Sequence, residues 1–209
     1  MRAGTSAVIA TSIVAAVTEA TRARLVPLRF LAGTPADVAD GKLWLLASNA
    51  LVADNPVVLS LIAFAGFGLA AGAVCGLRTL WVSAAAGHVG STVMVYLGLA
   101  AAGAVRPGAV EYVAHVKDYG VSAILAAWLG ALSLVLWRRH PAPRPRLAVA
   151  GFCALCTIVG LFADTNLTAL DADHVLAFAI GIACAAAAER ELRLVRAAAG
   201  AIHPPYPPG

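Results

Sequence analysis

Long apolar runs, separated by shorter polar segments, dominate this chain from end to end. Each run approaches the roughly 20 residues that an α-helix needs to cross about 30 Å of hydrocarbon. The pattern therefore predicts six transmembrane helices, and their expected positions are residues 4–20, 56–76, 79–104, 119–137, 147–163 and 172–188.

The segments between the runs are polar and contain helix-breaking residues. Residues 21–55 are predicted to form a long first loop, with short interfacial helices around 43–51. A proline-rich stretch at 141–145 ends the fourth run, since proline cannot continue a helix. Residues 1–200 are thus expected to form one six-helix domain, followed by a disordered proline-rich tail at 201–209.

The first run could also be read as a signal peptide, because a basic Arg2 precedes a small apolar region. No clean cleavage site with two small residues follows that region. We therefore interpret the run as an uncleaved first helix.

Composition supports this membrane interpretation. The chain is 61% hydrophobic and 12% charged, against about 45–50% and about 25% in a soluble domain. We therefore expect an all-α polytopic membrane protein. The four cysteines lie inside apolar runs, no H-x-x-H or H-E-x-x-H pattern occurs, and basic residues do not interleave with aromatic ones. We expect no metal, no cofactor and no nucleic-acid partner.

The distribution of basic residues predicts the orientation of the helices. With both termini on the same side, six spans place nine basic residues on that side and six on the other. Lysine and arginine accumulate on the cytoplasmic side of membrane proteins. We therefore expect cytoplasmic termini, in a bacterial plasma membrane.

Two polar residues far apart in the sequence are predicted to lie at the same depth. Ser122 lies about one turn into the fourth run and His174 about one turn into the sixth, and both runs go from outside to inside. Small residues follow each of them at four-residue spacing, which lets membrane helices pack closely. Serine needs an adjacent base to act as a nucleophile, and imidazole is such a base. Alternatively, Ser122 is only a helix cap and His174 an interfacial residue.

Four further residues lie near this pair in the sequence. Gly120 would let the backbone bend before Ser122, and Asp171 could orient the imidazole of His174 from one turn away. Asp118 is interpreted as a cap and Asp173 as a solvated charge. His88, about 13 Å from the inner end of the third run, is expected to lie far from Ser122 and to have a structural role.

The stretch Gly120-Val121-Ser122-Ala123 resembles the G-x-S-G nucleophile motif of rhomboid intramembrane serine proteases. The stretch from His174 to Gly181 resembles the last helix of that family. The stretch from Gly41 to Ser48 is similar to the segment that leads into the second span, and the long first loop also fits. The resemblance implies a Ser–His dyad without a third carboxylate, which cleaves transmembrane substrates near the outer membrane face.

The chain departs from the family pattern at two places. Ala123 replaces the glycine after the nucleophile, and the second run lacks the H-x-x-x-N pair that helps to hold the oxyanion; Asn55 is its closest amide. These departures motivate an alternative, a catalytically inactive rhomboid-like protein that binds membrane clients. A small transporter ranks last, because the runs contain no acidic residue at the membrane midplane.

Overall fold

A computed structural model describes residues 2–53, 56–139, 148, 151–152 and 171–202 of the chain. Throughout these residues the regular structure is helical, and no strand occurs among them. The longer helices are α1 (Arg2–Arg22), α4 (Val57–Cys75), α5 (Leu77–Val105), α7 (Val121–Arg139) and α9 (Ala172–Ile202). The shorter ones are η1 (Leu28–Phe30), α2 (Pro35–Ala39), α3 (Leu45–Ser48), η2 (Asn49–Leu51) and α6 (Pro107–Ala114).

Four helices are long and apolar enough to cross a membrane, namely α1 from Gly4 onward, α4, α5 and α7. Their bounds agree within two residues with the first four predicted runs. The chain is therefore an all-helical membrane protein. The predicted span at 147–163 lies almost wholly outside the described residues.

Two helical segments differ from the sequence-based expectation. The polar loop after the third run contains α6, which begins at Pro107, and proline is favoured in the first turn of a helix because its missing N–H needs no partner there. The final helix, α9, continues to Ile202 instead of ending near residue 188. Its added turns contain alanine, arginine, leucine and glutamate, which are all strong helix formers.

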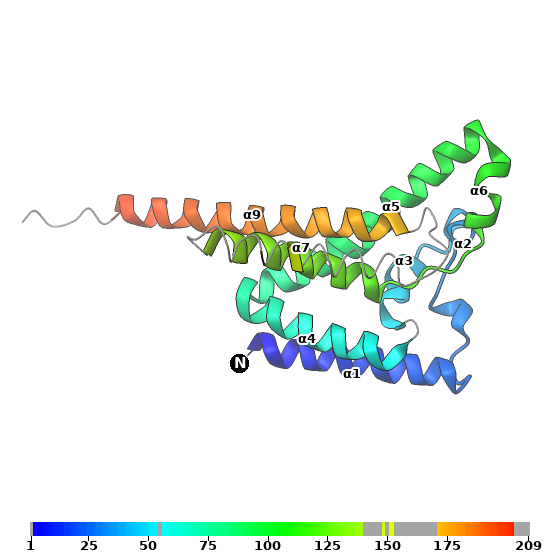
Figure 1. Ribbon diagram of the computed structural model, residues 1–209, viewed down its shortest axis with the longest axis horizontal. Coiled ribbons are helices and arrows are strands. Elements are labelled where there is room, and N and C mark those ends of the chain that lie inside the picture. Colours follow the sequence, from blue (N-terminus) through cyan, green and yellow to red (C-terminus); the bar gives the residue numbers. More distant parts are fainter. Residues whose placement is uncertain (1, 54–55, 140–147, 149–150, 153–170, 203–209) are drawn as a thin grey trace, which may run out of the picture.

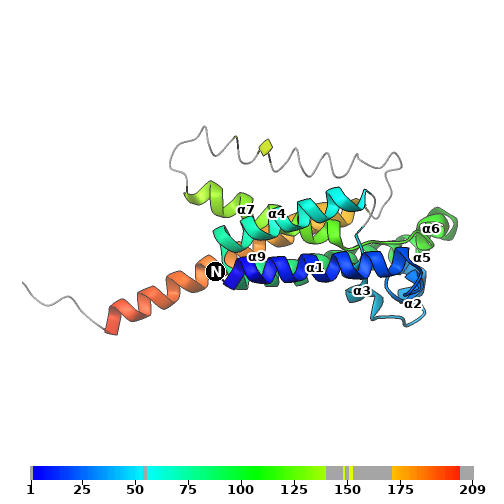
Figure 2. The ribbon, with the colours of Figure 1, turned by 90° about the horizontal axis from the view of Figure 1, so that it is seen from below.

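Figures 1 and 2 show how these helices are arranged. Helix α1 lies alongside α4, α7 lies alongside α9, and the long α5 crosses the bundle and continues beyond it towards α6. We call the end that carries α6 and the first loop the loop end. The opposite end, where α1 begins and α7 finishes, is called the termini end.

The centre of the bundle forms around Trp128 of α7, whose side chain is fully buried. Its ring packs on Phe64 of α4, with a centroid distance of 4.8 Å. Its indole Nε1–H donates to the backbone carbonyl of Leu80 on α5, at 2.9 Å. A buried indole needs such a partner, since an unpaired N–H in an apolar interior is costly. Trp128 thus connects three membrane-length helices.

Small residues allow α7 and α9 to pack with their backbones in contact. A Cβ added at Gly181 of α9 would lie 2.7 Å from the carbonyl carbon of Ala127 on α7, and one at Gly130 would lie 2.9 Å from the carbonyl carbon of Phe178. Close approach of this kind is how membrane helices gain packing energy where no hydrophobic driving force exists between them. The buried alanines along this α7–α9 seam are Ala123, Ala126, Ala127, Ala131, Ala177 and Ala185.

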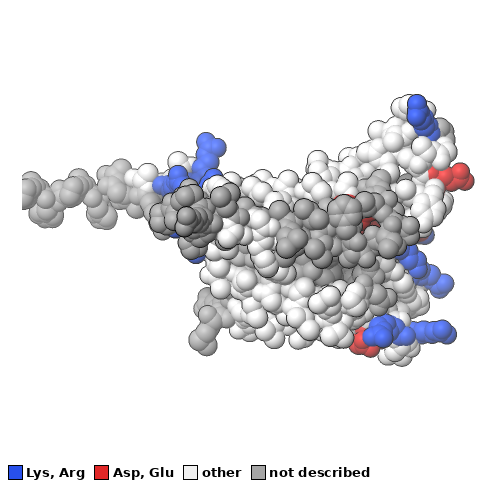
Figure 3. All heavy atoms as spheres, in the orientation of Figure 1, with Lys and Arg blue, Asp and Glu red and all other residues white. Residues whose placement is uncertain are grey.

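Most charged side chains on the face drawn in Figure 3 lie towards the two ends of the molecule, and the described residues between them are mostly uncharged. At the termini end, Arg78 of α5 pairs with Glu191 at 2.6 Å, and Arg138 of α7 pairs with Glu189. Both acids belong to α9, so these ion pairs lie at the end where α9 leaves the bundle. Exposed ion pairs of this kind contribute little to stability, about 1 kcal/mol or less.

Candidate functional site

The structure places Ser122 and His174 at the same end of the bundle, as the sequence predicts. Ser122 is the second residue of α7 and His174 the third residue of α9, and both helices begin at the loop end. The α7–α9 seam brings these two helix starts together. The predicted seam is correct for α9, where Ala177, Gly181 and Ala185 contact α7.

The contact face of α7 includes the predicted residues and is wider than predicted. Ala126 and Gly130, four and eight residues after Ser122, lie in the seam. The neighbouring row that begins at Ala123 and continues through Ala127 lies in it as well, and Ala127 packs on Gly181 about as closely as Gly130 packs on Phe178. Ser122 therefore lies beside the seam and not at its centre, and its side chain is only half-buried.

The Ser122 hydroxyl donates to the backbone carbonyl of Tyr119, at 3.2 Å. A hydroxyl has one proton, so in this structure the proton of Ser122 is directed to its own chain and not to His174. The residue lies in the first turn of α7, where backbone N–H groups have no partner within the helix. These donors and the positive end of the helix dipole suit a developing negative charge.

His174 is half-buried, and its Nδ1 is buried without a hydrogen-bond partner. Asp171, three residues earlier and half-buried, interacts electrostatically with the imidazole, and its backbone carbonyl faces the ring. The sequence-based placement of Asp171 beside His174 therefore agrees with the structure. An unpartnered ring nitrogen can accept a proton without first losing another hydrogen bond.

His88 does not lie far from Ser122, and the estimate of its depth from the sequence was wrong. Its ring packs directly on Gly120, two residues before Ser122: a Cβ at Gly120 would lie 2.7 Å from both ring nitrogens. The reason is the position of α5 along the bundle: Gly87 packs on Ala127 and the Leu80 carbonyl accepts from Trp128, so α5 is displaced towards the loop end relative to α7 and continues past its start. A residue near the middle of α5 is consequently level with the beginning of α7.

Asn49, at the start of η2, completes this contact and was not singled out from the sequence. Its side-chain Oδ1 lies 2.8 Å from Nε2 of His88, and its backbone carbonyl accepts from the N–H of Gly120 at 3.1 Å. With Oδ1 as the acceptor, His88 donates from Nε2, and its buried Nδ1 has neither a proton nor a partner. Gly120 is therefore enclosed by His88 and Asn49. Asn55 lies outside the described residues.

Two carboxylates lie close to the pair. Asp118 accepts a hydrogen bond from the hydroxyl of Tyr96 at 3.1 Å, and burial raises the pKa of its carboxyl while this bond opposes the rise. Asp173 is 5% exposed and faces Ser91 of α5, so its expected solvation was wrong. The physical reason is that α5 covers the side of α9 that would face water if α9 stood alone.

A pattern within the third run could have revealed the contribution of α5 to this site. His88, Thr92 and Tyr96 recur every four residues, which places them on one face of a helix. The side chains of His88 and Thr92 are 2% and 0% exposed, and the Tyr96 hydroxyl reaches Asp118. A polar stripe inside a membrane helix must face protein, because lipid offers it no partner.

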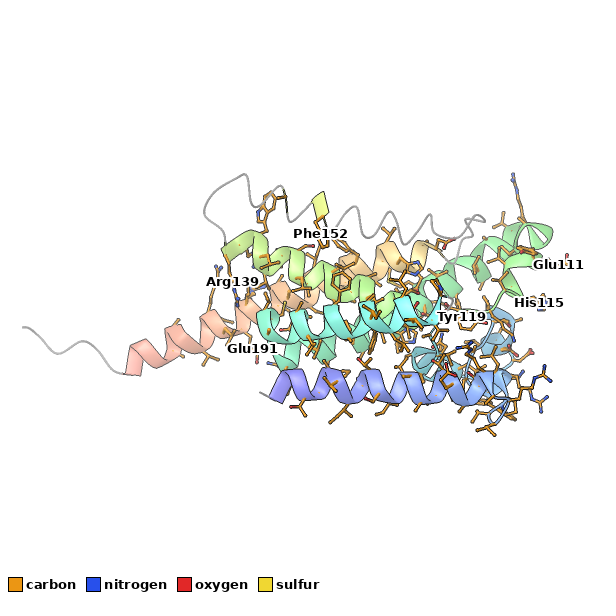
Figure 4. The ribbon with its side chains drawn as sticks, turned by 60° about the horizontal axis from the view of Figure 1, so that its bottom comes forward. Glu111, His115, Tyr119, Arg139, Phe152 and Glu191 are labelled. Atoms are coloured by element: carbon orange, nitrogen blue, oxygen red, sulfur yellow. The ribbon has the colours of Figure 1, made fainter. Side chains whose placement is uncertain are left out.

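Three further side chains, those of His115, Cys75 and Cys184, do not join the site. His115 is exposed and points away from the bundle beyond α6, on the side opposite to Arg139 and Glu191 (Figure 4). No group of metal-ligating side chains occurs among the described residues. Cys75 and Cys184 are free thiols, and Cys153 and Cys156 fall outside the described part of the chain.

Fold and site together define a polytopic helical membrane protein with a polar cluster at one end of its bundle. No protein family, curated protein or solved structure matches the chain.

Proposed function

We propose that this protein is a rhomboid-type intramembrane serine protease, with Ser122 as nucleophile and His174 as general base and acid. One observation carries the proposal: the first turn of α9 presents an unpartnered imidazole nitrogen at the same end of the bundle as the serine in the first turn of α7. The resemblance of the Gly120–Ala123 stretch to the rhomboid nucleophile motif supports the same assignment.

The chemistry requires the Ser122 hydroxyl to turn from the Tyr119 carbonyl towards His174. Catalytic hydrogen bonds are often long or misaligned in ligand-free enzymes and tighten when substrate binds. Ser122 Oγ then attacks the scissile carbonyl carbon and His174 takes its proton. The N–H groups at the start of α7 hold the oxyanion. His174 passes the proton to the leaving amine as the C–N bond breaks, and water hydrolyses the acyl-enzyme in the same way.

The substrates would be transmembrane proteins cut near one face of the bilayer. The site lies at the loop end of the bundle, and the sequence-based count of nine basic residues on the side of the termini against six on the other side favours a cytoplasmic position for the termini. The cleavage site would therefore be close to the outer face of the plasma membrane.

A second candidate function is client binding without catalysis. It is favoured by the hydrogen bond from Ser122 to Tyr119, which leaves the serine without its base, and by Ala123 at the position after the nucleophile. On this hypothesis the polar cluster stabilises the bundle, and the protein recognises transmembrane clients through its lipid-facing helices.

A fluorophosphonate probe separates the two functions. The purified protein in detergent is expected to be labelled at Ser122, and labelling should be lost in Ser122→Ala and His174→Ala, because the nucleophile and its activating base are then absent. The readout is probe incorporation measured by mass spectrometry.

Ser133→Ala is the matched control, because Ser133 also lies on α7 and donates to its own helix, to the Leu129 carbonyl at 2.6 Å. It should be labelled like the unaltered protein. A folded, monodisperse protein that takes up no probe would contradict the protease assignment and favour client binding.

A further inference from the structure

The loop segment that precedes Ser122 carries a carboxylate to the neighbourhood of His174. The contacts Ala127 to Gly181, and the clusters of Ala123 with Ala177 and of Ala131 with Ala185, define the register of the seam. In each case the two residues are 54 positions apart in the chain. In this register His174 is level with Gly120, whose carbonyl accepts the first hydrogen bond of α7, and Asp118 lies two residues earlier in the same segment.

Asp118 is held in this position at two points. Its backbone N–H donates to the carbonyl of Gly33 in the first loop at 3.0 Å. Its carboxylate accepts from the Tyr96 hydroxyl of α5 at 3.1 Å. Because the backbone and the carboxylate of Asp118 are each held by a hydrogen bond, the carboxylate stays beside the starts of α7 and α9.

The charged and titratable groups around His174 come from three elements. Asp171 precedes it on the α9 side, and Asp118 interacts with it electrostatically from the α7 side. Asp173 faces Ser91 of α5, and Tyr96 of α5 bonds to Asp118. His88 of α5 packs on Gly120 and interacts with Asn49. Among the carboxylates of the described residues, Asp118 is the one that reaches His174 from the segment that also carries Ser122.

We propose that Asp118 is a positioning residue for His174, which orients the imidazole and stabilises its protonated form. Its role in catalysis rests on the proposed protease function, but its coupling to His174 does not. In the proposed reaction the imidazole becomes positive after it accepts the serine proton, and a nearby carboxylate stabilises that charge. This adds a third residue to a pair that the family resemblance describes as a dyad.

Nuclear magnetic resonance of the ¹⁵N-histidine-labelled protein in micelles tests the coupling directly. The signals of His174 are assigned from their loss in His174→Gln, and the ring is titrated with pH. In Asp118→Asn the midpoint of this titration should fall by about one pH unit, since an opposite charge at close range has been removed. Asparagine still accepts the Tyr96 hydrogen bond, so the fold is expected to persist.

Two variants control for non-specific effects. Asp40→Asn removes an exposed carboxylate of the first loop and should leave the His174 midpoint unchanged. Asp118→Glu retains the charge, so the His174 midpoint should return most of the way to its value in the unaltered protein. If Asp118→Asn does not fold, Tyr96→Phe provides the second measurement. This variant keeps the Asp118 carboxylate but removes the hydrogen bond that holds it. The His174 midpoint should then fall by a smaller amount.

Probe labelling in the same samples separates this inference from the proposed function. A lowered midpoint together with about tenfold slower labelling of Ser122 in Asp118→Asn supports both. A lowered midpoint in a protein that never takes up the probe supports the coupling and contradicts the protease. A midpoint in Asp118→Asn equal to that in Asp40→Asn overturns the inference, whatever the labelling shows.

Discussion

Replacement of Gly181 by valine is expected to force α7 and α9 apart and thereby to destabilise the fold. A side chain at this position would meet the backbone of Ala127, with the carbonyl carbon at 2.7 Å and the Cα at 2.9 Å from the added Cβ. Backbone atoms inside a packed seam cannot move aside without separating the helices. We expect a loss of about 3 kcal/mol, the upper part of the range for overpacked cores.

The measurement is thermal unfolding in detergent, followed by the fraction that remains monodisperse. Gly98→Val in α5 is the matched control, because a Cβ at Gly98 meets nothing within 4 Å. Both substitutions place the same side chain in a long helix, so they share its intrinsic helix propensity. Equal unfolding temperatures for the two variants would show that the α7–α9 contact is not as close as described.

Replacement of Gly120 by alanine is expected to abolish labelling of Ser122 by the probe. The added Cβ would overlap the imidazole of His88, so either the ring moves and its hydrogen bond to Asn49 breaks, or the turn before Ser122 shifts. A displacement of about 1 Å at a reacting group can cost about 100-fold in rate. The measurement is the rate of probe incorporation, with the unfolding temperature recorded for the same samples.

A second substitution tests whether the clash with the His88 ring causes the loss of labelling in Gly120→Ala. Because the clash involves the His88 ring, His88→Ala together with Gly120→Ala should recover part of the labelling lost in Gly120→Ala alone. Gly108→Ala in α6 adds a methyl group where nothing lies within 4 Å, and it should behave like the unaltered protein. If the losses of labelling in His88→Ala and in Gly120→Ala simply add in the double variant, His88 and Gly120 act independently.

The length of a helix can be predicted from local sequence, but its position along the bundle relative to its neighbours cannot. His88 is an example. The length of the third run is evident from its composition, and α5 has almost the predicted bounds. The level of His88 relative to Ser122 depends on how far α5 continues past α7, which no local pattern contains. Asn49 was missed for a related reason: its partners, His88 and Gly120, are distant in the sequence.

The sequence by itself determined the membrane class, the bounds of the four membrane-length helices and the common end of Ser122 and His174. The class and the bounds depend on hydrophobic length, which is a local property. The common end follows from the alternating direction of successive spans, which the order of the apolar runs determines. Tertiary structure alone decided how wide a face of α7 contacts α9, and that His88, Asn49, Tyr96 and Asp118 surround the start of α7. Those contacts depend on the crossing of long helices and on the path of the first loop, where small residues set how closely backbones approach.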